Sequence, residues 1–322
     1  MMNTKGMWQI SIERYEHSRR QEWDECVKST RNATFLHLRS YMDYHQERFQ
    51  DHSLMVYVDG RLEALLPANA DGRDIWSHQG LTYGGLLTTP HVGTAMMMAV
   101  MDSIVNHLAD EGFHALYYKS IPYIYHRQPA EEDLYALWRR GAQLTARDIA
   151  SVVVPERAVA WRRDRRYNAN KARTDGVSVV RSHDYKAFWQ VLDDNLWHTY
   201  GVHPVHSLEE MELLAGRFPD NIRLYEARHK GEVVAGTVLY LTPMVAHAQY
   251  ISATPDGKHL HAVDALYRHL LTEELASWPY IDFGKSTENQ GLVLNESLIY
   301  QKEGFGGRGV CYDTYTLPLD KR

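Results

Sequence analysis

The sequence is poor in cysteine, and this shortage excludes several kinds of protein. Its 322 residues include only two cysteines, Cys26 and Cys311, which lie far apart and match no metal-ligand spacing. A secreted domain held together by disulfides would need more of them. We therefore expect two reduced thiols in a cytoplasmic protein and no bound metal.

Long apolar runs and an excess of positive charge are also missing. No stretch of about 18 apolar residues occurs, and the first residues, MMNTKGMWQISIERYEHSRR, lack the apolar run of a signal peptide. The net charge of -6 gives no whole-chain reason to expect a nucleic acid or an anionic membrane as partner. With 44% hydrophobic and 24% charged residues, the composition is that of a soluble globular protein without membrane insertion. Any anion-binding site must be local.

Two segments of the chain repeat the same order of predicted elements. Residues 54–80 and 222–253 each contain apolar strands separated by Asp-Gly, Lys-Gly or Thr-Pro turns, which predicts an antiparallel meander of three strands in each segment. Each meander is followed by a helix and then a strand that ends in Lys-Ser, at Lys119 and at Lys285. The separations from the first turn glycine to this lysine, 59 and 54 residues, indicate a duplicated unit.

One short strand and two helices precede the second meander, and Ser207 with Glu210 forms a capping box at the second of these helices. The predicted order is β-α-α-β-β-β-α-β-α-β, twice over. We predict an α/β fold with mixed sheets in two domains, residues 1–155 and 156–322. The joint lies near Pro155, ahead of a basic helix.

This repeated order resembles the acetyltransferase fold of the GNAT superfamily, and the tandem copy with a basic helix between the halves looks like the FemABX-type transferases and the BioF2-like acetyltransferase domains. The resemblance is carried by these segments: ARTDGVSVV, YGVHPVHSLEEMELLAGRFP, YIDFGKS, YGGLL, and YQKEGFGG, which looks like the Lys-x-x-Phe-Gly ending of that family. It implies two tandem GNAT-like domains and acyl transfer to an amine or hydroxyl. GNAT members use acyl-CoA, whereas FemABX members move an amino acid from aminoacyl-tRNA to a cell-wall precursor.

We therefore predict a GNAT-type N-acyltransferase. Its donor is acetyl-CoA or another acyl-CoA, and its acceptor is an amine of a small molecule or a cell-envelope precursor. The amine attacks directly, since no triad-like spacing indicates a covalent intermediate. Two alternatives stay open: an aminoacyl-tRNA-dependent peptidyltransferase of the FemABX type, with tRNA the less favoured partner of an acidic chain, and a non-catalytic ligand-binding protein. The second is supported by the segment ATPDGKHLHAVDAL, which has one glycine, Gly257, where GNAT proteins have a glycine-rich phosphate loop.

Four residues are the predicted catalytic groups. Lys302 precedes a glycine-rich turn, where its ammonium can face a donor phosphate or a tetrahedral oxyanion, and the resemblance implies a catalytic lysine here; the alternative is a solvated lysine at a helix end. Asp282 interrupts an apolar strand, as a partly buried general base does; the alternatives are that it pairs with Lys285 or caps a nearby turn. Tyr250 and Ser252 end a strand that borders the GNAT cleft, where a hydroxyl can bind the acyl carbonyl or relay a proton; ordinary sheet packing is the alternative.

Three further groups are predicted to bind ligands. The cofactor group is Gly257, Lys258 and His259, at a helix start that offers free N–H groups, together with Lys285 and Ser286. The second group is a loop with His203 and His206, which we expect to recognise the acceptor or to act as a general base; the alternative is that they are loop histidines with no chemical task. The third is the basic helix, which has six Lys or Arg residues against one acid between residues 161 and 173 and either contacts phosphates or is a solvated face. The predicted substrate-binding residues are His203, His206, Arg162, Arg166, Arg173 and Tyr83.

Overall fold

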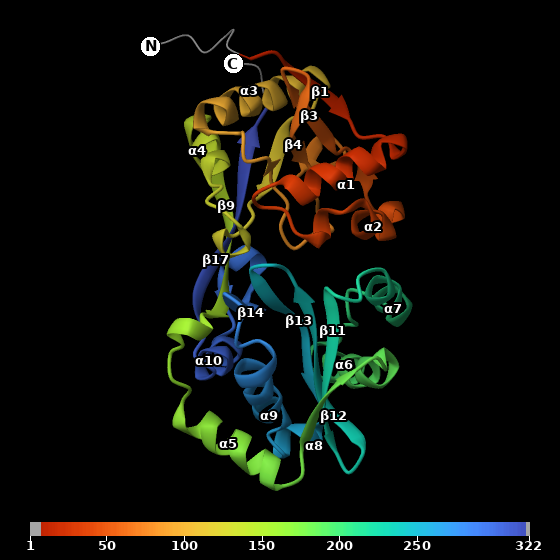
Figure 1. Cartoon of the computed structure of the whole chain (residues 1–322), viewed down its shortest axis with the longest axis vertical. Helices are drawn as coiled ribbons and strands as arrows, with labels where there is room; N and C mark the ends of the chain where they lie inside the picture. Colours follow the sequence, from red (N-terminus) through yellow and green to blue (C-terminus); the bar gives the residue numbers. More distant parts are fainter. Residues whose placement is uncertain (1–7, 320–322) are drawn as a thin grey trace. The chain divides into compact units, whose positions relative to one another are not determined.

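The computed structural model describes residues 8–319, which form two compact units (Figure 1). Unit 1 consists of residues 8–148, 289–292 and 311–319, and unit 2 of residues 149–288 and 293–310. The predicted boundary at Pro155 follows the sequence repeat. The two units are divided differently, because residues 149–155 of the first repeat belong to unit 2, and residues 289–292 and 311–319 of the second repeat belong to unit 1. The first seven residues of the first predicted domain and the last three residues of the second lie outside the described part. Within residues 8–319, no helix is both long and apolar enough to cross a membrane.

Unit 1 contains two sheets. One has the strand order β1-β3-β4-β7, and the other joins β2, β5, β6 and β8 to residues 311–318 of β17. The elements are β1 (Ile10–Arg14), α1 (Arg20–Ser29), α2 (Arg39–Met42), β2 (Gln50–Asp51), β3 (Leu54–Val58), β4 (Arg61–Leu66), β5 (Asn69–Asp71), β6 (Asp74–Trp76), β7 (Leu87–Thr88), α3 (Thr94–Asp110), β8 (Ala115–Lys119), α4 (Glu132–Arg139) and β9 (Gln143–Val153). The core packs apolar side chains of α3 and α4 against both sheets.

The first predicted meander is only partly correct. Strands β3 and β4 pair as expected, but β4 then pairs with β7, and the hairpin of β5 and β6 joins the other sheet beside β8. Pro67 follows β4 directly. Because proline has no backbone N–H, it cannot extend the ladder, and the next strand leaves this sheet.

Unit 2 has the predicted element order, and its three-stranded meander is confirmed. Its strands follow the order β10-β11-β12-β13-β14, next to residues 149–153 of β9. The elements are α5 (Arg163–Thr174), β10 (Ser178–Ser182), α6 (Tyr185–Tyr200), α7 (Leu208–Arg217), β11 (Ile222–His229), β12 (Glu232–Leu241), β13 (Val245–Ala253), α8 (Pro255–His259), α9 (Ala262–His269), β14 (Tyr280–Lys285), β15 (Thr287–Glu288), β16 (Val293–Leu294), α10 (Glu296–Gly304) and β17 (Arg308–Pro318).

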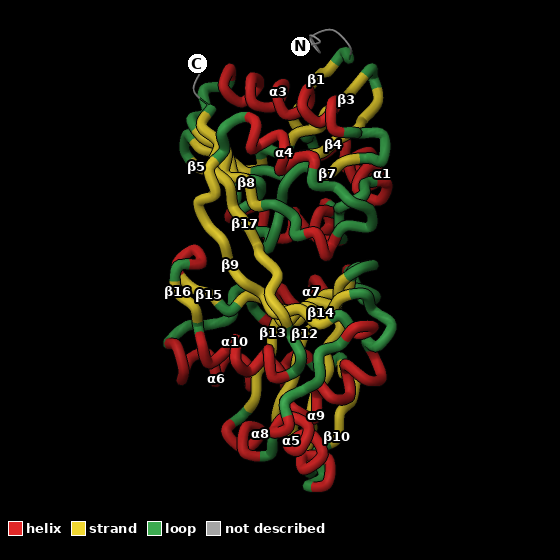
Figure 2. The backbone as a smooth tube through the Cα atoms, turned by 90° about the vertical axis from the view of Figure 1, so that its left-hand side faces the viewer, coloured by secondary structure: helices red, strands yellow, loops and turns green. Residues whose placement is uncertain are grey.

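Helices cover both faces of the unit 2 sheet. Figures 1 and 2 show α5 beside α9 on one face, and α6 and α7 lie on the other. Ala246 and Ala248 of β13 belong to the apolar core on the α9 face, as do Ile281 and Phe283 of β14. Since successive side chains of a strand point to opposite faces, the polar His247 lies on the α6 face, and so does the neighbouring Asp282.

The parallel strands β13 and β14 separate part-way along their length. They pair over three positions, the last of which sets His247 opposite Asp282. Beyond this pair, β13 stays with β12 across a β-bulge at Gln249, while β14 continues beside β9. Gly284 has a φ of +73°, a left-handed conformation that favours glycine. We call the place just after the His247–Asp282 pair the divergence point.

Candidate functional site

Asp282 lies at the divergence point and is fully buried. Its Oδ2 is 2.8 Å from Nδ1 of His247, and its Oδ1 accepts a hydrogen bond of 2.7 Å from the backbone N–H of Gly284. Both carboxylate oxygens are thus engaged inside the protein, and the bond from Gly284 agrees with the alternative that Asp282 caps a nearby turn. His247 was missed by the sequence reasoning, because only the strand register reveals that an isolated histidine in β13 faces this aspartate.

Lys302, in the last turn of α10, reaches the same place from another element. Its Nζ donates hydrogen bonds of 2.9 Å to the carbonyl oxygen of Gly284 and 2.6 Å to that of Lys285. The side chain is 5% exposed, so the alternative of a solvated lysine is wrong. Burial lowers the pKa of Lys302 to about 8, an effect that the nearby carboxylate of Asp282 opposes.

The Phe-Gly-Gly turn after Lys302 fixes the end of α10. Phe305 is buried against the rings of Phe283 and Trp161. Gly306 has a φ of +90°, and a Cβ there would lie 2.4 Å from the carbonyl oxygen of Val159. A side chain at this glycine is therefore excluded twice, by backbone conformation and by space. The turn holds Lys302 in reach of β14.

Tyr250 and His206 meet on the α6 face of the sheet. The Tyr250 hydroxyl lies 2.6 Å from Nδ1 of His206 and accepts a hydrogen bond of 3.3 Å from its backbone N–H. Burial raises the pKa of Tyr250 to about 12. This contact anchors the loop between α6 and α7 onto β13. Ser252 is buried and donates to the carbonyl oxygen of Val191 at 3.3 Å, so its hydroxyl also makes a contact within the fold.

His203, the other histidine of that loop, is exposed and lies apart from the buried contact. Its Nδ1 is 2.6 Å from Oδ1 of Asp193, and its ring stacks on Trp197 with centroids 5.0 Å apart. The side chain keeps 65% of its surface accessible. The loop thus contains one buried and one exposed histidine.

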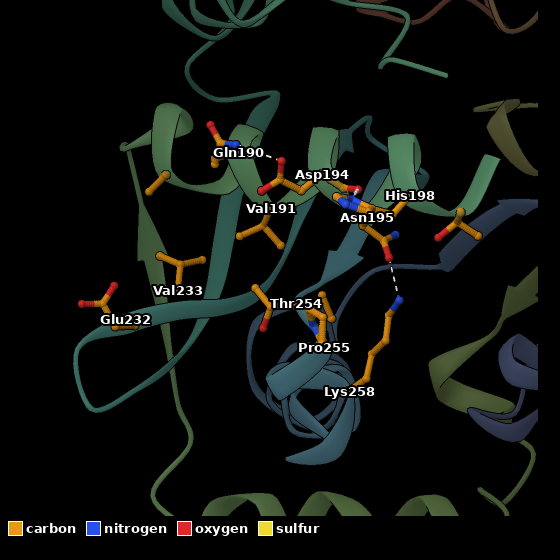
Figure 3. Close-up of a pocket in the computed structure, with 13 residues that line it drawn as sticks. Gln190, Val191, Asp194, Asn195, His198, Glu232, Val233, Thr254, Pro255 and Lys258 are labelled. Atoms are coloured by element: carbon orange, nitrogen blue, oxygen red, sulfur yellow. Dashed lines mark hydrogen bonds between the residues drawn. The ribbon is translucent and has the colours of Figure 1, made fainter. Parts of the chain in front are cut away.

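The predicted phosphate loop is a short capped helix, α8. The side chain of Thr254 accepts a hydrogen bond of 2.9 Å from the N–H of Gly257, and a Cβ at Gly257 would lie 1.9 Å from the carbonyl oxygen of Val234. This glycine therefore serves close packing against β12. Lys258 donates to Oδ1 of Asn195 at 2.6 Å (Figure 3), and His259 Nδ1 lies 2.8 Å from the carbonyl oxygen of Pro255. These groups do not form a cradle of free glycine amides for a pyrophosphate.

A pocket of about 660 Å³ opens beside α8 (Figure 3). It is lined by α6, the start of β12 and the residues that lead from β13 into α8. Its charged groups are Asp194, Glu232 and Lys258, two acids and one base, together with His198. This balance favours a neutral or cationic ligand over a diphosphate.

The last two predicted cofactor residues differ in exposure. Lys285 is exposed, whereas Ser286 is buried and pairs through its backbone with Ile149 and Asn295. Ser286 therefore extends the sheet contacts of β14, and it is not open to a ligand.

Comparison with known proteins agrees with this fold. Residues 156–289 match the model of a family described as "Acetyltransferase (GNAT) domain". The second half of the chain is therefore similar to GNAT acetyltransferase domains over these residues. The predicted resemblance to the GNAT N-acyltransferases is thus confirmed for these residues. No curated protein matches the sequence.

Solved structures extend the similarity to the whole chain. FemX matches with a TM-score of 0.66 and 11% identity, covering 95% of this chain and 97% of FemX. L-PGS from Bacillus licheniformis matches with a TM-score of 0.56 and 12% identity, covering 96% and 94%. The C-terminal domain of a protein from Agrobacterium fabrum, described as a lysylphosphatidylglycerol synthetase, matches with 0.60 and 11%, covering 94% and 92%. The predicted tandem GNAT fold with FemABX resemblance is confirmed.

The basic helix α5 lies within the matched residues, and about half of the positive charges of residues 161–173 are neutralised inside unit 2. Arg165 pairs with the buried Asp264 at 3.1 Å, and Lys171 pairs with Asp175 at 2.5 Å. Arg162 pairs with Asp164 at 3.2 Å and stacks over the ring of Tyr300.

The other arginines of α5 face outward. Arg166 is exposed, and Arg173 lines a groove of about 410 Å³ between α5 and α9, together with Arg268. No ion pair forms at Arg166 or Arg173 within the part of the chain that the structure describes. These two remain the members of the predicted set that are open to an anionic ligand.

Tyr83 of unit 1 is buried and does not face a substrate. Its hydroxyl lies 3.2 Å from that of Thr34, and its ring packs on Tyr125 with centroids 4.4 Å apart. Lys119, which matches Lys285 in the repeat, donates to the carbonyl oxygen of Leu81. The YGGLL segment thus packs onto β8. In unit 1 this segment fills the place at the end of β8 that corresponds to the divergence point at the end of β14.

Proposed function

We propose that the GNAT domain transfers an acyl group from an activated thioester or ester to the amine of a small molecule or a cell-envelope precursor. The reaction takes place at the divergence point of β13 and β14. The observation that carries this proposal is the buried cluster of Asp282, Gly284 and Lys302 at the place where β13 loses its partner strand. No strand pairs with this edge of β13 beyond His247 within residues 8–319, so its backbone N–H and C=O groups are available to a donor.

Lys302 suits the stabilisation of the acyl oxygen. A lysine ammonium has three N–H donors, and two of them bind the carbonyl oxygens of Gly284 and Lys285. The third is available for the negative charge that develops on the acyl oxygen as the amine attacks. Because Lys302 is buried, this interaction is screened little by water.

Acyl-CoA is the donor that we propose first, since the matching family is a family of acetyltransferases. The capped amide of Gly257 means that side chains, not a glycine loop, would hold its phosphates. The same observation favours a second candidate, an aminoacyl ester such as aminoacyl-tRNA. The fold similarity to FemX and the outward-facing Arg166 and Arg173 also support that donor.

Ligand-dependent thermal denaturation separates these donors. We expect acetyl-CoA to raise the melting temperature, because a ligand at 100 times its dissociation constant stabilises the folded state by about 2.7 kcal/mol. If charged tRNA alone raises the melting temperature, and if this rise is lost when Arg163, Arg166 and Arg173 are changed to Gln, the donor is the aminoacyl ester and not acyl-CoA. No shift with either donor or with UDP-sugars would favour the non-catalytic ligand-binding alternative.

Transfer itself is tested by following the release of CoA thiol from acetyl-CoA in the presence of small primary amines. Lys302→Met removes the buried ammonium and should reduce the rate at least 100-fold. Lys186→Met, an exposed position on α6, is the matched control and should leave the rate unchanged. Equal rates in the two variants would contradict the proposed site.

A further inference from the structure

We propose that His247 is the general base of this transfer and that Asp282 is its positioning residue. This inference rests on the proposed function, because it assumes that an amine is acylated at the divergence point. It assigns the base to a residue other than the aspartate that the sequence indicated.

The geometry fixes which nitrogen of His247 can act. An ionised aspartate can only accept hydrogen bonds. The 2.8 Å contact with Asp282 therefore places the proton of the neutral imidazole on Nδ1. Nε2 is then the unprotonated nitrogen. Among the residues described, no hydrogen bond is made to Nε2, and the side chain keeps 13% of its surface accessible.

Asp282 is suited to orienting His247 and not to taking a proton from the substrate itself. It has no exposed surface, and its second oxygen is occupied by the N–H of Gly284. Gly284 also lies beside the imidazole, because a Cβ at this position would be in ordinary van der Waals contact with Cε1 of His247, at 3.4 Å. Lys302 binds the carbonyl oxygen of the same glycine. Gly284 thus binds Asp282 through its N–H and Lys302 through its carbonyl oxygen.

The proton transfer balances for either class of donor. The amine nitrogen attacks the acyl carbonyl carbon, and a C–N bond forms while the proton of this nitrogen passes to Nε2 of His247. The C–S or C–O bond to the leaving group breaks, and the leaving group receives the proton from the imidazolium. The products are an amide and a free thiol or hydroxyl. Asp282 stabilises the imidazolium in between, as in a Ser-His-Asp triad.

Other candidates on this face are less suited. Tyr250 is bonded to His206, and its raised pKa makes it a poor base at neutral pH. Three titratable groups are connected to His247: Asp282 on β14 contacts the ring, Lys302 on α10 interacts with Asp282, and Tyr240 on β12 is the cross-strand neighbour of His247. Among these, only Asp282 contacts the ring with a carboxylate.

Two measurements test the assignment. Long-range ¹H–¹⁵N spectra of histidine-labelled protein report the tautomer, and we expect His247 to carry its proton on Nδ1. The pH profile of acetyl transfer to small amines reports the base. His247→Asn should lower kcat by 100-fold to 10,000-fold, change KM little and remove the acidic limb of the profile. His52→Asn is the matched control, since His52 is a buried histidine 2.9 Å from Glu111 in unit 1.

The outcomes separate this inference from the proposed function. If His247→Asn and His52→Asn retain the same rate and pH profile, transfer occurs without His247 as base and the inference is wrong while the proposed function stands. If the parent protein transfers no acyl group from acetyl-CoA, from p-nitrophenyl acetate or from aminoacyl-tRNA, the proposed function fails. The spectra then decide alone: an Nε2 proton on His247 overturns the dyad, and an Nδ1 proton that is lost in Asp282→Asn supports it.

Discussion

Replacing Lys302 by methionine tests whether the ammonium at the divergence point is as buried as its contacts indicate. Methionine keeps most of the side-chain volume and removes the charge and both hydrogen bonds to β14. The pKa of Lys302 is lowered to about 8 from the ordinary 10.5. Between these two values the unfolded chain binds more protons than the folded chain, so the stability contribution of Lys302 rises with pH.

The magnitude follows from the shift. Integrated from pH 7.5 to 9.5, this linkage raises the free energy of unfolding by about 2 kcal/mol. Methionine cannot titrate, so the difference in unfolding free energy between the parent and Lys302→Met should grow by this amount over the same range. Urea denaturation at the two pH values measures it, with Lys186→Met as the control for the loss of one lysine. A difference that stays constant or shrinks as the pH rises would refute the burial of the ammonium.

Two further predictions concern the elements that support the site. Gly257→Ala should destabilise the protein by about 1–3 kcal/mol, because the new Cβ clashes with the backbone of β12. Gly216→Ala, on the open surface of α7, is the control and should stabilise the protein by about 0.5–1 kcal/mol. Similar melting temperatures of the two variants would contradict the close packing at Gly257. Arg165→Ala should cost about 2–3 kcal/mol, because it leaves the buried Asp264 without its partner, and Arg166→Ala should cost less than about 0.5 kcal/mol in the same chemical denaturation experiment.

The order of elements was accessible from the sequence because it depends on local patterns. The Lys-Gly and Thr-Pro turns set the limits of β11, β12 and β13, and the capping box at Ser207 marks the start of α7. Strand partners were less accessible, since pairing is a long-range property. Nothing local to β6 tells that it joins β8 and not β4.

The same distinction holds for the site. Asp282 and Lys302 could be predicted as candidates because a charge inside an apolar strand and a lysine before a glycine turn are unusual locally. His247 could not be found in this way, because its role depends on the register that sets it opposite Asp282. Tyr83 was misjudged for the converse reason: its motif resembles a binding segment, whereas its ring is enclosed by packing from distant residues.

A crystal structure with a non-transferable analogue of the donor that the transfer assay selects tests the central claim most directly. We predict that the acyl carbonyl lies along the unpaired edge of β13 next to the divergence point, with its oxygen within hydrogen-bond distance of Lys302 Nζ. An acyl group bound in unit 1, or in the pocket beside α8 and away from His247, would contradict the account.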